Sequence, residues 1–352
     1  MIEGHINLYS DTQTRPTPAM LEAMMTAKVG DEQHGLDPSV NELCARVADL
    51  LGKEAAVFLP SGTMCNEIAI LVHCRPGDEI YAHESAHIII SEGGGPTALA
   101  GACVYPMRGE RGIFSAETLR ASLRIESRYT PKPRLVEIEQ TANSGGGSVW
   151  SLAEIETVAA VAKERQLLMH MDGARLFNAV VAAGVSARQF AAPFDSVWID
   201  LSKGLGCPIG GVLAGSREFV DEAWRWKQRI GGALRQAGFL AAAGLYALDN
   251  HIDRLADDHA NARRFGEIVD QCPGVRLAPP EIATNLVFVD VAETGLTAVA
   301  IRDRLEERGI NIGAMGVTRL RAVTHLDISR AQAEEAGRTF VEVVNELREA
   351  GA

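Results

Sequence analysis

Between about residue 40 and residue 215 the chain alternates short apolar runs with longer amphipathic segments. The apolar runs have the length and composition of β-strands, and each segment between them is long enough for a helix. Parallel strands need such a crossover, because the chain must return to the same edge of the sheet before the next strand begins. The alternation therefore predicts an α/β protein with a mostly parallel sheet flanked by helices on both faces.

The same pattern gives the expected elements and the expected domains. We expect strands at 55–59, 79–82, 102–106, 134–139, 167–171, 196–201 and 211–214, and helices at 40–51, 63–74, near 86–92, near 115–125 and at 151–165. The helical pattern then lengthens from residue 217 onward. After Pro279-Pro280 a smaller unit follows, with a strand at 285–291, a helix at 297–308, strands near 310 and 321, and a helix from Arg330. We expect a large domain of residues 1–250, which includes an N-terminal arm, and a small α/β domain of residues 251–352.

Composition limits the classes of partner. A chain of 352 residues with 47% hydrophobic residues can bury a large core. The net charge of −12, without a clustered basic patch, argues against nucleic acid and against an anionic membrane surface. Small anions remain possible ligands at local positive sites.

The cysteines and the N-terminus indicate a cytoplasmic location. None of the six cysteines stands in a CxxC spacing, so we expect reduced thiols with no metal and no disulfide role. The first residues have neither a basic start nor an apolar stretch, and no segment approaches the roughly 18 apolar residues of a membrane span. We therefore expect no signal peptide and no transmembrane helix.

Two strand ends carry reactive side chains. Lys203 follows the apolar run 195–202 and stands directly before Gly204, and Asp172 follows the apolar run 167–171. A lysine after a strand is usually a solvated loop residue, and an Asp-Gly pair is usually a turn. Ligands of parallel sheets, however, collect at the carboxyl ends of the strands. Lysine and aspartate together there suit pyridoxal phosphate, which needs an amine for a Schiff base and an acid beside its pyridine nitrogen.

A third segment predicts a phosphate cradle. Ser61, Gly62 and Thr63 lie between an expected strand and an expected helix, where free amide groups and the helix dipole favour an anion. Serine and threonine before a helix are often only caps, so this signal is weak alone. The pattern GxxxxGK[ST] is absent, and a monophosphate is therefore a better guest than a nucleotide triphosphate.

Two further motifs are weaker. His83-Glu-Ser-Ala-His87 fits HExxH, which would imply a zinc hydrolase if both histidines shared one helix face. A strand runs directly into the motif and glycines 93–95 follow it, which is a poor setting for such a helix. Gly93 to Ala98 fits the dinucleotide pattern GxGxxG/A, but it lies inside the sheet region and Pro96 interrupts it.

Seven segments in order along the chain resemble the low-specificity L-threonine aldolases. They are Ser10-Asp-Thr-Gln-Thr-Arg-Pro16, Leu59-Pro-Ser-Gly-Thr63, Ser85-Ala-His87, Met171-Asp-Gly-Ala-Arg-Leu-Phe-Asn-Ala-Val180, Leu201-Ser-Lys-Gly-Leu-Gly206, Arg235-Gln-Ala-Gly238 and Arg321-Ala-Val-Thr-His-Leu-Asp327. The Asp-Gly-Ala-Arg and Ser-Lys-Gly-Leu-Gly segments are specific in combination. The resemblance implies a carbon-carbon lyase of amino acid metabolism with the fold type I of pyridoxal phosphate enzymes. It also implies a homotetramer, a dimer of dimers.

The resemblance also implies roles for individual residues. Lys203 would carry the cofactor, Asp172 would pair with its pyridine nitrogen, and His87 would stack on its ring. The phosphate would be held by Ser61, Gly62 and Thr63, joined by Arg235 from another subunit. The substrate carboxylate would be bound by Ser10, Arg175 and Arg321, with Arg175 also close to the cofactor, since a planar guanidinium suits a carboxylate. No metal is expected.

The chain departs from the family at two positions. Relatives commonly have Glu-Asn-Thr-His-Asn where this chain has Glu139-Gln-Thr-Ala-Asn143, and they usually have a tyrosine where this chain has His34. Ala142 can neither accept a proton nor donate a hydrogen bond. We therefore expect the catalytic imidazole to come from His34, reaching across a subunit interface, or from His87 through a water molecule. His34 could equally be a loop histidine with no proton role.

The sequence leaves more than one substrate and more than one reaction open. Ala142 predicts a roomier, more apolar site that would favour a bulky β-hydroxy-α-amino acid such as phenylserine over threonine. We expect cleavage to glycine and an aldehyde, with a β-eliminating lyase as the alternative. A pyridoxal-binding protein without turnover and the zinc hydrolase are weaker alternatives, because a fold and a cofactor motif do not by themselves establish the reaction.

Overall fold

In the computed structural model, which describes residues 5–351, the apolar runs form one seven-stranded sheet in the order β2-β8-β7-β6-β5-β3-β4. The pairs from β4 through β7 are parallel, whereas β8 is antiparallel to both of its neighbours. The predicted mostly parallel sheet is therefore confirmed. The strands are β2 (Ala55–Leu59), β3 (Asp78–His83), β4 (Cys103–Met107), β5 (Lys132–Glu139), β6 (Leu168–Gly173), β7 (Ser196–Asp200) and β8 (Gly211–Gly215).

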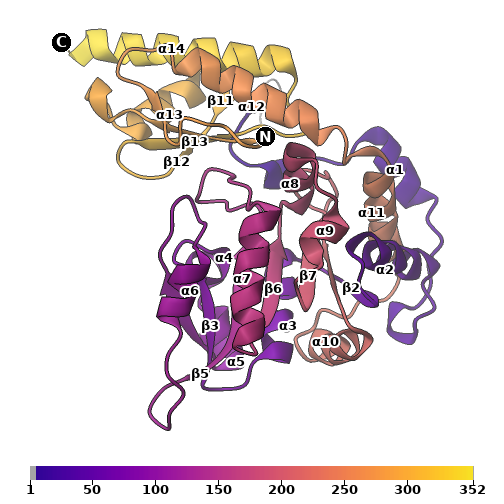
Figure 1. The fold of residues 1–352 in the computed structure, drawn as a ribbon. Helices are drawn as coiled ribbons and strands as arrows, with labels where there is room; N and C mark the ends of the chain where they lie inside the picture. The colour runs from indigo at the N-terminus through magenta and orange to yellow at the C-terminus, as the bar shows by residue number, and fades with distance from the viewer. Residues whose placement is uncertain (1–4, 352) are drawn as a thin grey trace. The chain divides into compact units, whose positions relative to one another are not determined.

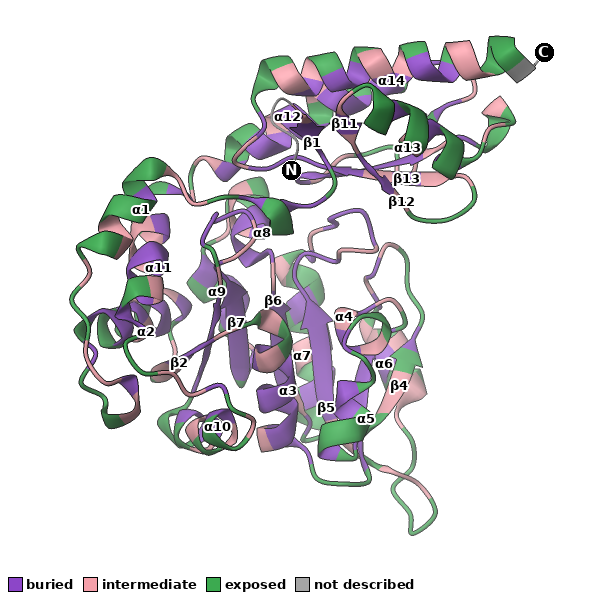
Figure 2. Ribbon diagram, turned by 180° about the vertical axis from the view of Figure 1, so that it is seen from behind, coloured by how far each residue is buried: buried purple, intermediate pink, exposed green. Residues whose placement is uncertain are grey.

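Helices cover both faces of this sheet, with α7 (Leu152–Glu164) in front and α3 (Gly62–His73) behind in Figure 1. The central strands β5, β6 and β7 are mostly buried and purple in Figure 2, whereas the edge strand β4 is partly exposed. The burial of the central strands explains why their sequences are continuous apolar runs with few alternating polar residues. The other helices of this unit are α1 (Pro18–Met25), α2 (Pro38–Leu51), α4 (His87–Ile90), α5 (Gly95–Ala100), α6 (Ala116–Ser122), α8 (Leu176–Ala183), α9 (Ala187–Ala191), α10 (Arg217–Arg229) and α11 (Gly238–Asn250).

Capping residues account for several helix ends. The Asp37 carboxylate accepts a hydrogen bond from the backbone N–H of Val40, and Pro38 begins α2 at a position where its missing N–H costs nothing. Gly52 ends α2 in the left-handed conformation, with φ of 66°. In α7 the Ser151 side chain and Glu154 form a reciprocal capping box.

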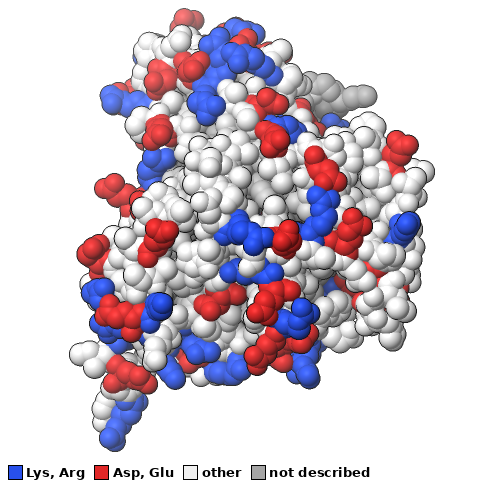
Figure 3. Space-filling view, turned by 45° about the vertical axis from the view of Figure 1, so that its right-hand side comes forward, with Lys and Arg blue, Asp and Glu red and all other residues white. Residues whose placement is uncertain are grey.

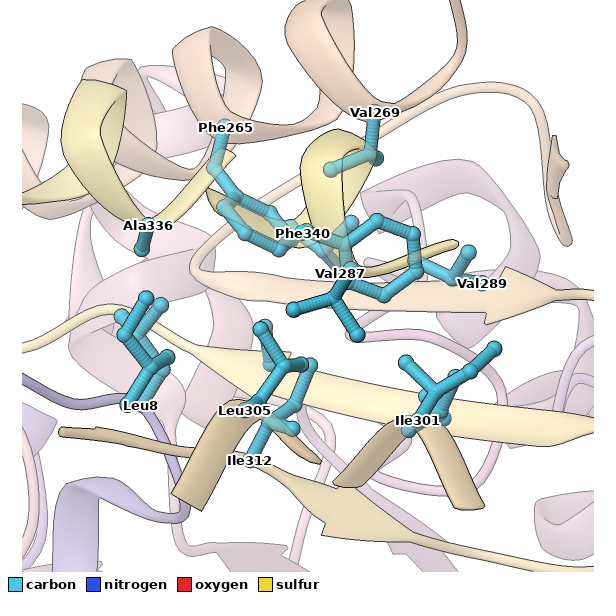
Figure 4. Packing of buried hydrophobic residues seen from close by; sticks show 14 of the residues in the cluster. Leu8, Phe265, Val269, Val287, Val289, Ile301, Leu305, Ile312, Ala336 and Phe340 are labelled. Carbon is cyan, nitrogen blue, oxygen red and sulfur yellow. The ribbon is translucent and has the colours of Figure 1, made fainter. Parts of the chain in front are cut away.

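The smaller unit has its own sheet, in the order β12-β13-β10-β9, and its own helices. Its elements are α12 (Leu255–Val269), β9 (Arg276–Leu277), β10 (Leu286–Asp290), α13 (Ala298–Glu307), β11 (Ile310–Asn311), β12 (Gly313–Ala314), β13 (Arg319–Val323) and α14 (Arg330–Gly351). The core is apolar, with Phe265, Val287, Ile301, Leu305 and Phe340 among its buried side chains (Figure 4).

The N-terminal segment packs with this smaller unit. β1 (Ile6–Asn7) pairs in parallel with β11, and Leu8 lies in the core shown in Figure 4. Packing divides the chain into one unit of residues up to Arg15 and from Asp253, and another of Pro16–Ile252. The folding domains 1–250 and 251–352 remain a prediction, and this packing suggests assigning the N-terminal arm to the small domain.

The expected elements are confirmed in most places, and the differences have local causes. The helix expected near 86–92 is only the short α4, and α5 is an additional helix that the sequence pattern did not predict. Gly94 caps α5 in the left-handed conformation, and Pro96 lies in its first turn, where proline is tolerated.

The surface carries charges of both signs (Figure 3), and the cysteines are unpaired. On the face that Figure 3 shows, Lys and Arg side chains are interspersed with Asp and Glu side chains. No helix among residues 5–351 is both long enough and apolar enough to span a bilayer. All six cysteines are free thiols, and Cys103 on β4 is the exposed one.

Candidate active site

Lys203 lies just beyond the carboxyl end of β7, as its sequence position predicted. Its Nζ is 3.0 Å from the Asp200 carboxylate, and its side chain is 17% exposed. It also lies 5.9 Å from the centre of the Trp198 ring. The amine is thus held near a carboxylate and an aromatic surface while remaining reachable, which a covalent cofactor linkage requires.

Asp172 ends the neighbouring strand β6 and is almost wholly buried. One carboxylate oxygen accepts a hydrogen bond from the backbone N–H of Ala174 at 2.9 Å. The other oxygen accepts from the side-chain amide of Asn66 at 2.8 Å. Both carboxylate oxygens are thereby fixed in position by N–H donors.

The segment predicted to hold a phosphate forms the start of α3, and its role as an anion cradle remains a prediction. The Ser61 Oγ caps the helix by accepting from the backbone N–H of Met64. A Cβ atom at Gly62 would lie 2.2 Å from the Trp198 ring, so only glycine lets the helix start so close to β7. The first amide groups of a helix have no intrahelical partner, and those of Gly62 and Thr63 suit a phosphate.

His87 begins α4 and forms a close pair with Glu92. Its Nδ1 lies 2.6 Å from a carboxylate oxygen of Glu92, whose side chain is fully buried, whereas the imidazole is 35% exposed. This hydrogen bond raises the pKa of His87, the Asp172 charge raises it further, and the Lys203 charge opposes both. The structure therefore brings His87, Asp172 and Lys203 into one electrostatic group.

Glu92 is a site residue that the sequence analysis missed. It follows the apolar run 88–90 and precedes three glycines, a position with no strand-end signal. Its carboxylate also accepts from the Asn66 amide at 2.7 Å. An isolated acid after an apolar run is the only pattern that could have indicated it.

The same residues form a candidate metal trio. Ligand atoms of His87, Glu92 and Asp172 all lie within 4.8 Å of one another. Asn66 donates to both carboxylates and Glu92 pairs with His87, so these hydrogen bonds account for the closeness without an ion. The expected absence of a metal remains a prediction.

The HExxH motif does not form the helix that zinc hydrolases need. His83 belongs to β3, while His87 begins α4. The His83 ring contacts the Ser85 hydroxyl at 2.8 Å and the Gly109 carbonyl at 3.2 Å. The two histidines therefore do not share one helix face, and the zinc alternative loses its structural basis.

Glu139, at the end of β5, joins two loops of the site. Its carboxylate accepts from the backbone N–H groups of Asn143, at 2.9 Å, and His87, at 3.2 Å. Burial raises its pKa to about 7, and the Asp172 charge adds to this effect. The sequence pattern predicted no separate role for Glu139, whose hydrogen bond to the His87 N–H fixes the start of α4.

Arg175 is buried at the start of α8 and faces the same region. Its guanidinium lies 3.4 Å from the Asn143 side-chain oxygen, and its backbone N–H donates to the Gln140 carbonyl. Its charge also lowers the pKa of Glu139. The predicted arginine is thus within the electrostatic group of the larger unit.

Ser10 and Arg321 come together within the smaller unit. The Ser10 Oγ accepts from the Thr12 backbone N–H at 3.2 Å and lies 2.8 Å from the Thr12 hydroxyl. Arg321, on β13, donates to the carbonyl of Tyr9, the residue before Ser10, at 3.4 Å. Arg321 thus contacts the residue before Ser10, although more than 300 positions separate them in the sequence.

His34 and Arg235 meet at a third place, around Asp31 in the larger unit. The His34 Nδ1 lies 2.9 Å from the Asp31 carboxylate, and the Arg235 guanidinium lies 3.5 Å from the same oxygen. Their side chains are 71% and 62% exposed. The two residues expected to reach another subunit therefore form one exposed group.

Ala142 does not leave the expected space. It is 2% exposed, and its backbone N–H donates to the Ser148 carbonyl at 3.0 Å. A Cβ atom at Gly112 would lie 2.4 Å from the Ala142 Cβ, so the loop containing Gly112 packs directly on this side chain. The expectation of a roomier site at the Ala142 side chain is wrong, because a neighbouring loop fills the room.

Comparisons with known proteins agree with this geometry. Residues 7–293 match the model of the beta-eliminating lyase family. The low specificity L-threonine aldolase of Escherichia coli (strain K12) is 40% identical over 331 residues, which cover 94% of this chain and 96% of that protein.

Two solved structures have a similar fold. The threonine aldolase of Leishmania major has a TM-score of 0.82 at 23% identity, and the match covers 97% of this chain and 99% of that one. A structure of SPT with PLP has a TM-score of 0.75 at 18% identity, covering 97% of this chain and 88% of that one. The fold is therefore the fold type I of pyridoxal phosphate enzymes.

Proposed function

Because the chain belongs to the low-specificity L-threonine aldolase family, within the beta-eliminating lyases, we propose that it is a pyridoxal phosphate-dependent aldehyde-lyase. Its substrates are β-hydroxy-α-amino acids such as L-threonine, L-allo-threonine or phenylserine, which it cleaves to glycine and an aldehyde. The single observation that carries this proposal is the placement of Asp172 and Lys203 at the carboxyl ends of the neighbouring strands β6 and β7, with His87 brought beside Asp172 by the start of α4.

The residues present fit pyridoxal phosphate. Lys203 offers a reachable amine, Asp172 offers a buried carboxylate already held by two N–H donors, and α3 begins at a glycine that no larger residue could replace. Arg235 of another subunit would complete the phosphate site. When bound, the cofactor withdraws electrons from the bond that breaks at the substrate Cα.

Substrate orientation decides which bond breaks, and we assign it to three residues. Ser10, Arg175 and Arg321 bind the substrate carboxylate and turn the Cα–Cβ bond into the reactive direction. The guanidinium groups suit this role because each can present two parallel donors to a carboxylate. The contact between Arg321 and the Tyr9 carbonyl supports the pairing of Arg321 with Ser10.

The proton of the β-hydroxyl is taken by an imidazole. His87 is favoured by its place in the Lys203 group and by Glu92, which fixes its Nδ1 and leaves Nε2 for a substrate or a water. His34 serves the role if its exposed group reaches a neighbouring subunit. Replacing His34 by phenylalanine should lower the cleavage rate about 100-fold if it is the base. An unchanged rate assigns the role to His87.

A homotetramer built from two dimers is part of the proposal. Exposed apolar side chains lie on α1, on the following loop and at the start of α11: Leu21, Met25, Val29, Leu36 and Phe239. Such a surface favours burial against another chain. Light scattering of the purified protein should give four times the mass of one chain, and a monomer would contradict the assignment of Arg235 and His34. We also propose a cytoplasmic location, which the free cysteines support.

Two experiments test the function. Borohydride reduction of the cofactor-saturated protein, followed by peptide mapping, should place the cofactor on the peptide containing Lys203, and a label elsewhere would overturn the proposal. Incubation with L-threonine, L-allo-threonine and L-phenylserine should yield glycine and the corresponding aldehyde. Pyruvate and ammonia would instead identify the β-eliminating lyase, and cofactor binding with no product would identify a protein without turnover.

A further inference from the structure

Asn66 lies on α3 and has all four of its side-chain hydrogen-bonding positions occupied. Its Oδ1 accepts from the Trp198 indole N–H at 2.7 Å and contacts the His170 Nε2 at 3.1 Å. Its Nδ2 donates to Glu92 at 2.7 Å and to Asp172 at 2.8 Å. The amide is fully buried, so a reversed orientation would face two carboxylates with an oxygen and two N–H donors with a nitrogen.

The partners behind Asn66 have fixed proton positions as well. His170 must donate from Nε2, because Asn66 Oδ1 can only accept, and burial lowers the His170 pKa to about 3, which keeps the ring neutral. Its Nδ1 therefore accepts from the Ser196 hydroxyl at 2.8 Å. Ser196 in turn accepts from the Nε2–H of His73, another neutral histidine, at 2.7 Å. The chain of hydrogen bonds thus runs in one direction, from His73 to Asn66.

Both carboxylates that end this chain point to the cofactor groups. Asp172 is the expected partner of the pyridine nitrogen, and Glu92 holds the His87 imidazole at 2.6 Å. Without the amide, two buried carboxylates would face each other with no donor between them, at a cost in charge repulsion and lost hydrogen bonds. The two groups that contact the cofactor therefore depend on one side chain that does not contact it.

We propose that Asn66 is a positioning residue that fixes Asp172 and the Glu92–His87 pair through a single amide, with His170 and Ser196 holding that amide in one orientation. This inference rests on the proposed function, since it assigns Asp172 and His87 to the cofactor. Asn66 acts through the two carboxylates, and its replacement changes how the cofactor is bound and protonated before it changes any later step.

The test uses Asn66→Asp, which keeps the size of the side chain and removes its two N–H donors. Loss of one hydrogen bond to a charged group predicts a pyridoxal phosphate dissociation constant about 10- to 100-fold higher, measured by fluorescence titration of the apoenzyme. The pH at which the visible absorption band of the cofactor changes should also shift. Ser196→Ala should shift both quantities in the same direction by a smaller amount, because it leaves Asn66 in place.

A matched control separates positioning from a general loss of stability. Asn261 is also a buried asparagine, and its amide donates to the Ile328 carbonyl in the smaller unit. Asn261→Asp should lower the melting temperature while leaving the cofactor dissociation constant and the absorption change as in the wild type. If Asn66→Asp matches this control in both cofactor measurements, the inference is wrong.

Failure of the proposed function gives a different result. In that case the wild-type protein itself would not bind pyridoxal phosphate on Lys203, and no variant could be compared. A wild-type protein that binds the cofactor, together with an Asn66→Asp variant that binds it equally well at every pH, would overturn only the role of Asn66.

Discussion

The interiors of the two units differ in kind. The smaller unit is held by an apolar core in which Phe265 and Phe340 pack edge to face at 6.3 Å, surrounded by aliphatic side chains. The larger unit instead buries a polar layer between its sheet and α3, made of Asn66, Glu92, Glu137, His170, Asp172 and Ser196. Apolar burial stabilises by about 1.5–3 kcal/mol per large side chain, whereas a buried polar group costs free energy unless it is hydrogen-bonded.

The position of the polar layer explains why it persists. It lies beneath the strand ends that carry Asp172 and Lys203, so its hydrogen bonds reach the groups expected to hold the cofactor. One of its members is not hydrogen-bonded: among the described residues, neither carboxyl oxygen of Glu137 has a hydrogen-bond partner. Burial raises the pKa of Glu137 well above its usual value. The interior of the smaller unit thus mainly stabilises the fold, whereas the polar layer of the larger unit lowers stability and fixes the positions of charged groups.

The largest expected effect tests the apolar core. Phe340→Ala removes a fully buried ring and should lower the free energy of unfolding by about 3–5 kcal/mol, because it leaves a cavity. Denaturant titration measures this change. Tyr129→Ala, at a side chain that is 87% exposed, is the control and should change stability little. A loss of cofactor absorbance in folded Phe340→Ala protein would contradict the view that the apolar core contributes only to stability.

A smaller effect tests the cost of the polar layer. Burial raises the pKa of Glu67, on α3, from 4.5 to about 8, and the Glu92 charge adds to this. The folded protein then binds a proton that the unfolded chain releases, so stability falls as the pH rises from about 4.5 to 8. Glu67→Gln should therefore be more stable than the wild type by about 2 kcal/mol at pH 8.5, once the pKa shift is discounted for solvent screening, and equal to it at pH 4. Equal melting temperatures at both pH values would contradict a buried, protonated Glu67.

A third prediction tests how the charge of Glu92 affects the His87 pKa while the hydrogen bond from Asn66 is kept. Glu92→Gln keeps an oxygen that accepts from Asn66 but removes the charge that raises the His87 pKa. The neutral imidazole then persists to lower pH, so the acid limb of kcat/KM should move to lower pH, while kcat/KM at pH 8 changes less than about 10-fold.

The His87–Glu92 pair also makes the stability of the fold depend on pH. Because the His87 pKa is raised in the folded state, the pair stabilises the fold fully below about pH 6.5 and loses this contribution as the pH rises through the raised pKa. Glu154→Gln, at an exposed capping residue, is the control and should leave the pH profile unchanged. An acid limb that does not move in Glu92→Gln would show that His87 is not the group that titrates.

The smallest expected effect concerns the contribution of an exposed ion pair, outside the polar layer, to stability. Arg120 and Glu164 form a surface ion pair at 2.7 Å, and both side chains are about half exposed. Arg120→Ala should change the free energy of unfolding by less than about 0.5 kcal/mol, because solvent screens the pair. A change in the free energy of unfolding as large as that of Glu67→Gln would mean that exposed and buried charged groups contribute equally to stability.

Most of the fold could be predicted because buried parallel strands leave a clear apolar signal. The seven predicted strands of the larger unit all appear, and β2 has the same bounds as its prediction. The antiparallel direction of β8 could not be predicted, since periodicity carries no information on strand direction. The pairing of β1 with β11 was also missed, because two residues give no periodic pattern and their partner is about 300 positions away.

Candidate site residues at strand ends could be predicted from the sequence, whereas a candidate residue inside a helix could not. Lys203 and Asp172 follow apolar runs, so their positions could be deduced. Asn66 lies within an otherwise ordinary helical segment, and only the structure places it under Asp172. The effect of Ala142 was misjudged because the sequence does not indicate that the loop of Gly112 packs on it. The roles of all the candidate site residues, including Lys203 and Asp172, remain predictions.

The thiol distribution described for the fold has a practical consequence. Burial raises the pKa of Cys44 and Cys74 to about 12 and also raises the pKa of Cys65 and Cys207, while Cys103 is exposed on a strand at the sheet edge. Alkylating dyes react with thiolates, so at neutral pH they should attach almost entirely to Cys103. The native chain therefore carries its own attachment point for a fluorophore, and assembly could be followed by energy transfer without engineering a new cysteine.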